Sequence, residues 1–237
     1  MERYDRQLRI FGFGIEKQSR LKRACVAVFG VGGLGSISSA YLAMAGVGRL
    51  MIIDKDVVSI TDLNRQILYT MHDIGKLKVE VAAKKLSELN PEVEVEGIAL
   101  DVTVDDASHV ISKADVVIDG LDSFKARFIV SSEAYRRGKP FVHGAVYEFE
   151  GRLTTIIPRD TPCLKCTLGN PCDHEVVVPV IGPAAGVIGS LQAIEAIKLI
   201  TGYGDPLKGK ILIFSGDNMK FYFVDVDLNR RCEVCAR

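Results

Sequence analysis

The chain is 237 residues long, enough for one sizeable domain with its own hydrophobic core. Its 30 lysines and arginines balance its 30 aspartates and glutamates, which excludes the broadly basic surface of a typical nucleic-acid-binding protein. The composition, 48% hydrophobic and 25% charged, is that of an ordinary soluble globular protein. We therefore expect a folded protein with no nucleic acid as partner.

The chain begins Met-Glu-Arg-Tyr-Asp-Arg-Gln, without the apolar stretch of a signal peptide, so we expect a cytoplasmic protein. The longest uncharged stretch runs over residues 176–194, but Pro179, Pro183 and several glycines interrupt it. A buried loop leading into a core helix explains this stretch better than a membrane span does. No membrane association is predicted.

Apolar strand patterns alternate with helical patterns through the first part of the chain. Residues 24–29 form a continuous apolar run that ends at a glycine, and residues 50–54 form a second run. This alternation predicts an α/β fold, a Rossmann-like and mostly parallel sheet with helices on both faces. The other elements expected here are helices at 76–89 and 124–137 and strands at 93–100, 115–120 and 140–144.

The pattern changes beyond Gly151. Strands at 152–157, 211–214 and 221–226 are expected to be antiparallel and to surround a hydrophobic helix from about residue 186 to 200. We therefore predict one domain over residues 1–237. Its nucleotide-binding half ends near residue 145, and a C-terminal half follows from about residue 146.

A glycine-rich turn follows the first expected strand. Gly30, Gly32, Gly33 and Gly35 fit the pattern G-x-G-x-x-G, which lets backbone amides and a helix N-terminus approach phosphate oxygens. Asp54 ends the next strand, 24 residues after Gly30, where a carboxylate can accept hydrogen bonds from ribose hydroxyls. A nucleotide is therefore expected. The motif alone favours NAD and does not separate a dinucleotide from ATP.

Two Cys-x-x-Cys pairs suggest a metal site. Cys163 and Cys166 form the first pair, and Cys232 and Cys235 form the second. Four thiolates suit a closed, tetrahedral and structural zinc site, which would tie the end of the chain to the body of the domain. Metal-free or redox-active thiols are the alternative. Cys25, in an apolar strand, is expected to be a small core residue.

Segments along the whole chain resemble the ThiF/MoeB/HesA family in order and spacing. These proteins are similar to the adenylation domain of ubiquitin-activating enzymes. The resemblance implies that ATP and magnesium convert a carboxylate, usually the C-terminal glycine of a ubiquitin-like protein, into an acyl adenylate with release of pyrophosphate. Besides the glycine loop and the paired cysteines, the segments that carry the resemblance are 3–7, 54–56, 63–66, 75–78, 121–122 and 186–193.

Attack of a carboxylate on the α-phosphate brings two anions together, so the site needs cations. Arg65 and Lys78 are the expected local cations, and Arg6 is implied by resemblance to reach in from the neighbouring subunit of a homodimer. Read without the family pattern, Lys78 is a solvated helix residue and Arg6 a surface ion-pair partner. Asp122 is expected to bind magnesium, and Asp54, Asp56 and Gln66 to contact the nucleotide.

Three positions depart from the family pattern. Cys172 lies in a loop where some members carry a reactive cysteine, but the reactive position aligns near Glu175, so a catalytic cysteine and an unreactive one both remain open. Asp62 stands where the family usually has Asn; the added carboxylate either binds metal or weakens ATP binding. Ser123 replaces another common Asn, with a modest expected effect.

The leading prediction is an ATP-dependent adenylyltransferase that activates a ubiquitin-like sulfur-carrier protein. One alternative keeps the adenylation but replaces the protein by a small-molecule carboxylate of cofactor biosynthesis, such as guanylylpyridinol of the iron hydrogenase cofactor. A second alternative is a catalytically silent nucleotide-binding scaffold, and a third is a dinucleotide oxidoreductase. The intact set of Arg6, Arg65, Lys78 and Asp122 opposes the scaffold, which has no electrostatic reason to keep these charges.

Overall fold

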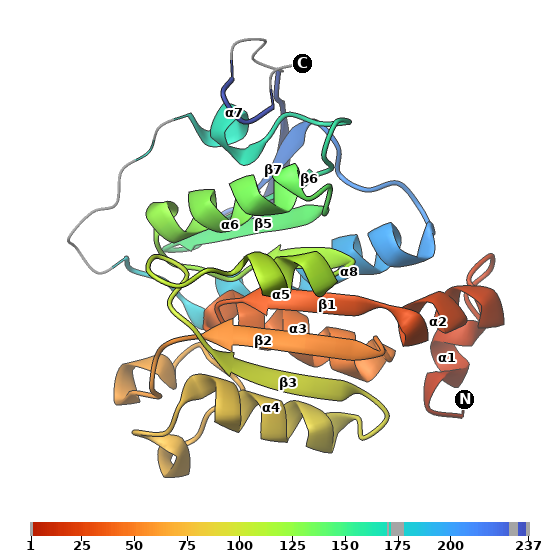
Figure 1. Cartoon of the computed structure of the whole chain (residues 1–237), viewed down its shortest axis with the longest axis vertical. Coiled ribbons are helices and arrows are strands. Elements are labelled where there is room, and N and C mark those ends of the chain that lie inside the picture. The colour runs from red at the N-terminus through yellow and green to blue at the C-terminus, as the bar shows by residue number, and fades with distance from the viewer. Residues whose placement is uncertain (1, 170, 172–177, 228–231, 236–237) are drawn as a thin grey trace.

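The architecture is taken from a computed structural model, which describes residues 2–169, 171, 178–227 and 232–235. Within these residues, eight strands form one sheet in the order β3-β2-β1-β4-β5-β6-β7-β8 (Figure 1). The strands are β1 Cys25–Phe29, β2 Arg49–Asp54, β3 Glu94–Ala99, β4 Val116–Asp119, β5 Phe141–Tyr147, β6 Glu150–Ile156, β7 Lys210–Ser215 and β8 Lys220–Asp225. The α-helices are α1 Asp5–Leu8, α2 Gly14–Arg23, α3 Gly33–Ala45, α4 Lys78–Leu89, α5 Ser108–Lys113, α6 Phe124–Arg136, α7 Leu164–Leu168 and α8 Gly182–Thr201.

Strands β1 to β5 pair in parallel, in the spatial order β3-β2-β1-β4-β5 of a doubly wound sheet. The strand order reverses between β1 and β4, and ligands of such sheets bind at the carboxyl ends of the strands next to that reversal. From β5 onward each pair is antiparallel. The predicted fold class, a parallel Rossmann-like sheet extended by antiparallel strands, is confirmed.

The two faces of the sheet carry separate cores because side chains alternate along each strand. In β1, Val26 and Val28 point toward α3, α4 and α8, whereas Ala27 and Phe29 point toward α5, α6 and α7. Figure 1 shows α5 and α6 in front of the strands, with α3 and α8 behind. All four of these β1 side chains are fully buried. Burial on both faces explains why β1 appears in the sequence as an unbroken apolar run.

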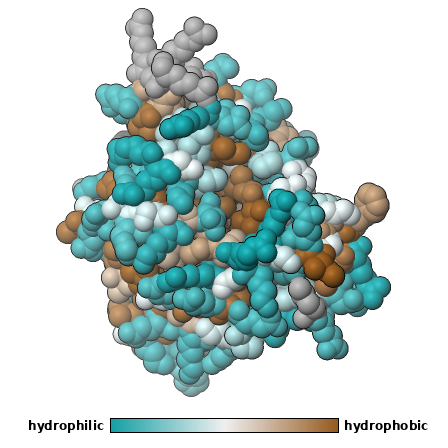
Figure 2. All heavy atoms as spheres, turned by 45° about the vertical axis from the view of Figure 1, so that its right-hand side comes forward, coloured by the Kyte–Doolittle hydropathy of each residue, from teal (hydrophilic) through white to brown (hydrophobic). Residues whose placement is uncertain are grey.

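Helix α8 explains the long uncharged stretch. By length and composition alone it passes as a membrane span, with a mean hydropathy of 1.3 over its most apolar window. It packs against α3, β5 and β6, however, and half of that window is buried inside the protein. Figure 2 shows one side of the surface as mostly hydrophilic, with apolar side chains in small groups. Core packing therefore accounts for the hydropathy of this helix.

Several boundaries differ from the sequence expectations. Helix α8 begins at Gly182, four residues before the expected start, because Pro183 occupies the first turn, where proline is tolerated. Helices α1, α2, α5 and α7 were not expected.

Cys25 lies at the start of β1 and is only half-buried, and burial raises the pKa of its thiol to about 11. An unreactive structural residue is still the best description of Cys25.

Candidate active site and cysteine cluster

The glycine loop fits tightly between the ends of β1 and β4. Gly30 has φ of +82°, and a Cβ atom there would lie 2.5 Å from the carbonyl oxygen of Gly120. A Cβ atom at Gly35 would lie 1.9 Å from the carbonyl oxygen of Gly30. Neither position admits a side chain. The loop therefore delivers the N-terminus of α3, which begins at Gly33, to the point where the strand order reverses.

Asp54, at the end of β2, supports this loop directly. Its carboxylate accepts a hydrogen bond from the Val31 amide at 2.9 Å and another from the Asp56 amide at 2.9 Å. Burial raises the pKa of Asp54, and these two amide hydrogen bonds oppose that shift. Each carboxylate oxygen can accept a further bond, so the side chain can hold the loop and still receive a hydroxyl group.

Lys78 is buried at the start of α4, so the interpretation of a solvated helix residue is wrong. Its side chain is 8% exposed, and its Nζ lies 3.4 Å from Asp56 Oδ2 and 3.6 Å from Asp62 Oδ2. The Tyr69 hydroxyl donates to the carbonyl oxygen of Val31 at 2.9 Å, which joins the segment before α4 to the glycine loop. A buried cation with two carboxylate partners therefore lies beside the loop.

Arg65 and Gln66 approach the loop from the neighbouring turn. A Cβ atom at Gly33 would lie 3.6 Å from Arg65 Cγ, and one at Gly32 would lie 3.6 Å from Gln66 Nε2. Arg65 Nη1 donates to the Thr61 carbonyl at 2.7 Å. Gln66 is 4% exposed and donates to Asp62 Oδ1 at 2.7 Å, so it supports the loop from within the protein.

Asp122 lies on the same edge, in the turn between β4 and α6, and is exposed. Gly120, two residues earlier, is the residue whose backbone contacts Gly30. The charge of Asp122 also reaches Lys55, which follows β2. The pKa of Lys55 is raised, chiefly by its hydrogen bond to Asp101 and in smaller part by the negative charge of Asp122. Ser123 caps α6, because its hydroxyl accepts a hydrogen bond from the Ala126 amide at 3.3 Å. This capping role explains why a serine serves at that position.

A buried polar network under this turn was not anticipated from the sequence. Asp119 is the last residue of β4, and His143 follows the apolar pair Phe141–Val142 in β5. His143 Nδ1 lies 2.6 Å from Asp119 Oδ2. Arg127 Nε lies 3.6 Å from the same carboxylate oxygen and also donates to the Leu121 carbonyl at 3.1 Å. Asp119 Oδ1 accepts from the Leu121 amide at 3.0 Å. The network therefore fixes the turn that carries Asp122. A polar residue directly after an apolar run in each of these two strands was the available signal.

Arg6 does not lie with the other predicted residues of its own chain. It is exposed on α1, whose Gln7 donates to the Ala45 carbonyl at the C-terminal end of α3. The glycine loop lies at the N-terminal end of α3, and a helix of 13 residues is about 20 Å long. Figure 1 shows α1 and α2 on the opposite side of the molecule from the heads of the β1 and β2 arrows. Within one subunit, Arg6 and the glycine loop are therefore separate.

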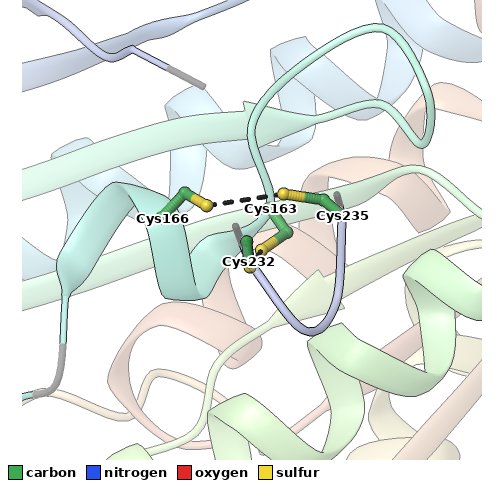
Figure 3. Close-up of side chains that lie close together, drawn as sticks. All are labelled: Cys163, Cys166, Cys232 and Cys235. Carbon is green, nitrogen blue, oxygen red and sulfur yellow. Dashed lines mark hydrogen bonds between the residues drawn. The ribbon is translucent and has the colours of Figure 1, made fainter. Parts of the chain in front are cut away.

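The four paired cysteines come together where α7 meets the segment 232–235 (Figure 3). Their sulfur atoms all lie within 4.8 Å of one another; Cys163 and Cys232 are 3.5 Å apart, and Cys166 and Cys235 are 3.4 Å apart. These distances exceed a disulfide bond of about 2.05 Å and are close to the roughly 3.8 Å between sulfurs of a tetrahedral zinc site with 2.3 Å bonds. The donor set therefore fits a structural metal such as zinc.

Two further features, the loop around Cys172 and a cavity beside α8, are not part of the site described above. Cys172, with the loop around Glu175, lies outside the described residues, so its chemistry stays a prediction. A separate cavity of about 500 Å³ lies between α8 and β6–β8, lined by Leu191, Ile194 and Phe223 among others. Among the described residues, none of the predicted site residues lines this cavity. The candidate active site is therefore the glycine-loop edge of the sheet.

Comparison with a family model decides the family. The ThiF family model matches residues 4–235. The chain belongs to the ThiF family. It is 39% identical over its full length to a sulfur carrier protein adenylyltransferase of Thermus thermophilus, covering 91% of that protein. It is 37% identical to the molybdopterin-synthase adenylyltransferase of Escherichia coli, covering all of this chain and 97% of that protein. This ThiF-family chain is accordingly an enzyme of the adenylyltransferase type.

Solved structures agree with this assignment. The crystal structure of E. coli MccB with ATP superposes with a TM-score of 0.88 at 28% identity, covering 99% of this chain and 73% of MccB. MccB in complex with N-formylated MccA gives a TM-score of 0.90 at 26% identity, covering 99% of this chain and 75% of MccB. The ThiF-family fold is thus shared over nearly the whole chain.

The cysteine cluster makes a prediction about metal content. We expect about one zinc ion per chain in the purified protein, because four sulfurs at this spacing form a closed site. The double substitution Cys232→Ser and Cys235→Ser should remove the zinc and lower Tm by at least about 5 °C. Elemental analysis and thermal melts measure both effects. Cys25→Ser is the matched control and should keep the metal; full zinc content in the double variant would contradict the assignment.

The Asp119–His143 pair predicts a pH dependence of stability. Burial lowers the pKa of His143 in the folded protein, and its hydrogen bond to Asp119 opposes this shift. Below about pH 6.5 the unfolded chain takes up a proton that the folded chain does not, so stability falls as pH falls, by up to about 1.4 kcal/mol per pH unit. Denaturant titrations between about pH 7.5 and 5.5 should show this slope. His143→Asn should reduce it and His72→Asn, at an exposed position, should not; an unchanged slope in His143→Asn excludes this origin.

Proposed function

We propose that the chain uses ATP and magnesium to adenylate the C-terminal carboxylate of a ubiquitin-like sulfur-carrier protein. The observation that carries this proposal is the convergence of Arg65, Lys78 and Asp54 on the glycine loop at the strand-order reversal. Two cations at a phosphate-binding loop suit a reaction between two anions. The names of the curated relatives support a sulfur carrier as substrate.

Each residue of the candidate site has a role in the proposed adenylation. A carboxylate oxygen of the substrate attacks the α-phosphorus of ATP, the bond from that phosphorus to the bridging oxygen breaks, and pyrophosphate leaves with the electron pair. Arg65 and Lys78 neutralise the phosphates during this exchange, and the loop amides and the N-terminus of α3 orient them. Asp122 would hold magnesium, which adds positive charge at the phosphate oxygens. Asp54 and Asp56 lie where the ribose is expected.

We further propose that the whole chain is one adenylation unit that works as a cytoplasmic homodimer, in which Arg6 completes the partner's site. Arg6 is exposed and lies about one helix length from the glycine loop of its own chain. Ile10, Phe11 and Ile15, close to it in sequence, are also exposed, and Phe11 is 97% exposed. Exposed apolar groups next to an exposed cation support a subunit contact there.

Pyrophosphate exchange tests the reaction and its substrate class. The full-length protein with magnesium should catalyse ATP–pyrophosphate exchange only when a Gly-Gly-ended ubiquitin-like protein is present. A sulfur carrier should support exchange, and small carboxylates including guanylylpyridinol should not. Exchange with a small acid alone would replace the substrate class, and binding of ATP without exchange on any carboxylate would favour the scaffold.

Mixing two inactive variants tests the role of Arg6. Arg6→Ala and Asp122→Ala should each lower the exchange rate at least about 100-fold, the scale of losing a preorganised charge contact. When the two variants are unfolded and refolded together, mixed dimers contain one intact site, so about a quarter of the wild-type rate should return. Arg3→Ala is the control and should be active alone. No recovery on mixing would place Arg6 outside the partner's site.

A further inference from the structure

Asp62 holds both local cations of the candidate active site. Its Oδ2 lies 3.6 Å from Lys78 Nζ, and its Oδ1 lies 3.7 Å from Arg65 Nη2. Resting on the function proposed above, we propose that Asp62 is a positioning residue that holds Lys78 and Arg65 when phosphate is absent and thereby lowers the affinity of the site for ATP and pyrophosphate. Asp62 itself touches neither substrate nor product.

The contacts of Asp62 show that it is built into the turn. Its side chain is 8% exposed and caps the 3₁₀ turn Ile60–Asp62, accepting from the Ser59 amide at 2.9 Å and the Ser59 hydroxyl at 3.2 Å. Gln66 adds a third hydrogen bond at 2.7 Å. The carboxylate is therefore fixed in place, and the two cations have a defined anionic partner before any nucleotide arrives. It is not grouped with other potential metal ligands among the described residues.

Two ion-paired carboxylates oppose the two cations at this point. Lys78 and Arg65 contribute two positive charges, while Asp56, 3.4 Å from Lys78 Nζ, and Asp62 contribute two negative ones. An incoming triphosphate must therefore compete with carboxylates for both cations. Two unit charges about 4 Å apart attract or repel each other strongly even at an effective dielectric constant near 20. The effect must grow with the charge of the ligand, so it is larger for ATP and pyrophosphate than for AMP.

Asparagine is a near-isosteric replacement that removes only the charge. Its amide oxygen can still accept from the Ser59 amide. Its amide nitrogen replaces the oxygen that now accepts from Gln66 Nε2, so the Gln66 amide group must turn over. The new amide nitrogen then donates to Gln66 Oε1, a buried atom that has no hydrogen-bond partner among the described residues. The capped turn is thus expected to persist in Asp62→Asn.

Asp73 provides a matched control from the same chain. It caps the next 3₁₀ turn, Met71–Asp73, in the same way, accepting from the Thr70 amide at 2.9 Å and the Thr70 hydroxyl at 2.7 Å. It is also buried, and its cation partners are Lys85 at 2.6 Å and Lys76 at 3.4 Å rather than site residues. Asp73→Asn therefore removes the same charge from the same motif outside the site.

The experiment measures binding of three ligands to the full-length protein with magnesium by calorimetry. The ligands are α,β-methylene-ATP, pyrophosphate and AMP. Asp62→Asn should lower the Kd of the first two by roughly 5- to 20-fold and change that of AMP less than about twofold. In pyrophosphate exchange KM for ATP should fall by a similar factor, with kcat changed much less. Asp73→Asn should match the wild type in all three affinities.

Unchanged or weaker binding of α,β-methylene-ATP by a folded Asp62→Asn protein overturns the inference, as does an equal change for all three ligands. Asp62→Ser, which keeps a short acceptor for the Ser59 amide, gives the same test if the first variant melts early. Failure of the proposed function is distinguishable. In that case the wild type itself shows no binding of α,β-methylene-ATP and no exchange, whereas failure of the inference alone leaves both intact.

Discussion

The site depends on glycine backbones that pack directly against each other where the strand order reverses, between β1 and β4. The carbonyl of Gly120, after β4, occupies the space that a side chain at Gly30 would need, and the carbonyl of Gly30 does the same at Gly35. Only with these contacts can the loop turn sharply enough to start α3 beside the end of β4. The turn that carries Asp122 and the loop expected to bind phosphate are therefore positioned against each other by main-chain atoms.

Around this contact the protein pairs its buried charges internally. Asp54 holds a loop amide, Lys78 lies between two carboxylates, and Asp119 is shared by His143 and Arg127. A charge taken out of water costs several kcal/mol unless such partners exist. The site is thus preorganised in the absence of nucleotide, and binding exchanges internal ionic partners for phosphate instead of ordering free side chains.

Features encoded by local patterns could be predicted from the sequence. A mostly parallel sheet followed from apolar runs alternating with helical spacing, and the sulfur cluster from two Cys-x-x-Cys pairs. The Asp119–His143 contact was not predictable in the same way. The two residues are 24 positions apart in sequence and meet only because β4 and β5 pair in a particular register, and in the sequence each one looks like the end of a strand. The position of Asp62 was anticipated, but whether it would contact metal, phosphate or protein depended on where the buried Lys78 ammonium lay.

The cysteine cluster also determines how the second half of the chain is enclosed. Cys163 and Cys232 are 69 residues apart in sequence, and α8, β7 and β8 all lie between them. A metal that joins the two pairs closes this segment into a ring. On the chain-entropy scale for covalent cross-links, a ring of that size removes about 4 kcal/mol of freedom from the unfolded chain. The N-terminus of α8, where Ala185 packs against Gly33, belongs to that ring. Metal coordination by the two cysteine pairs thus favours the folded form of a helix that supports the nucleotide loop.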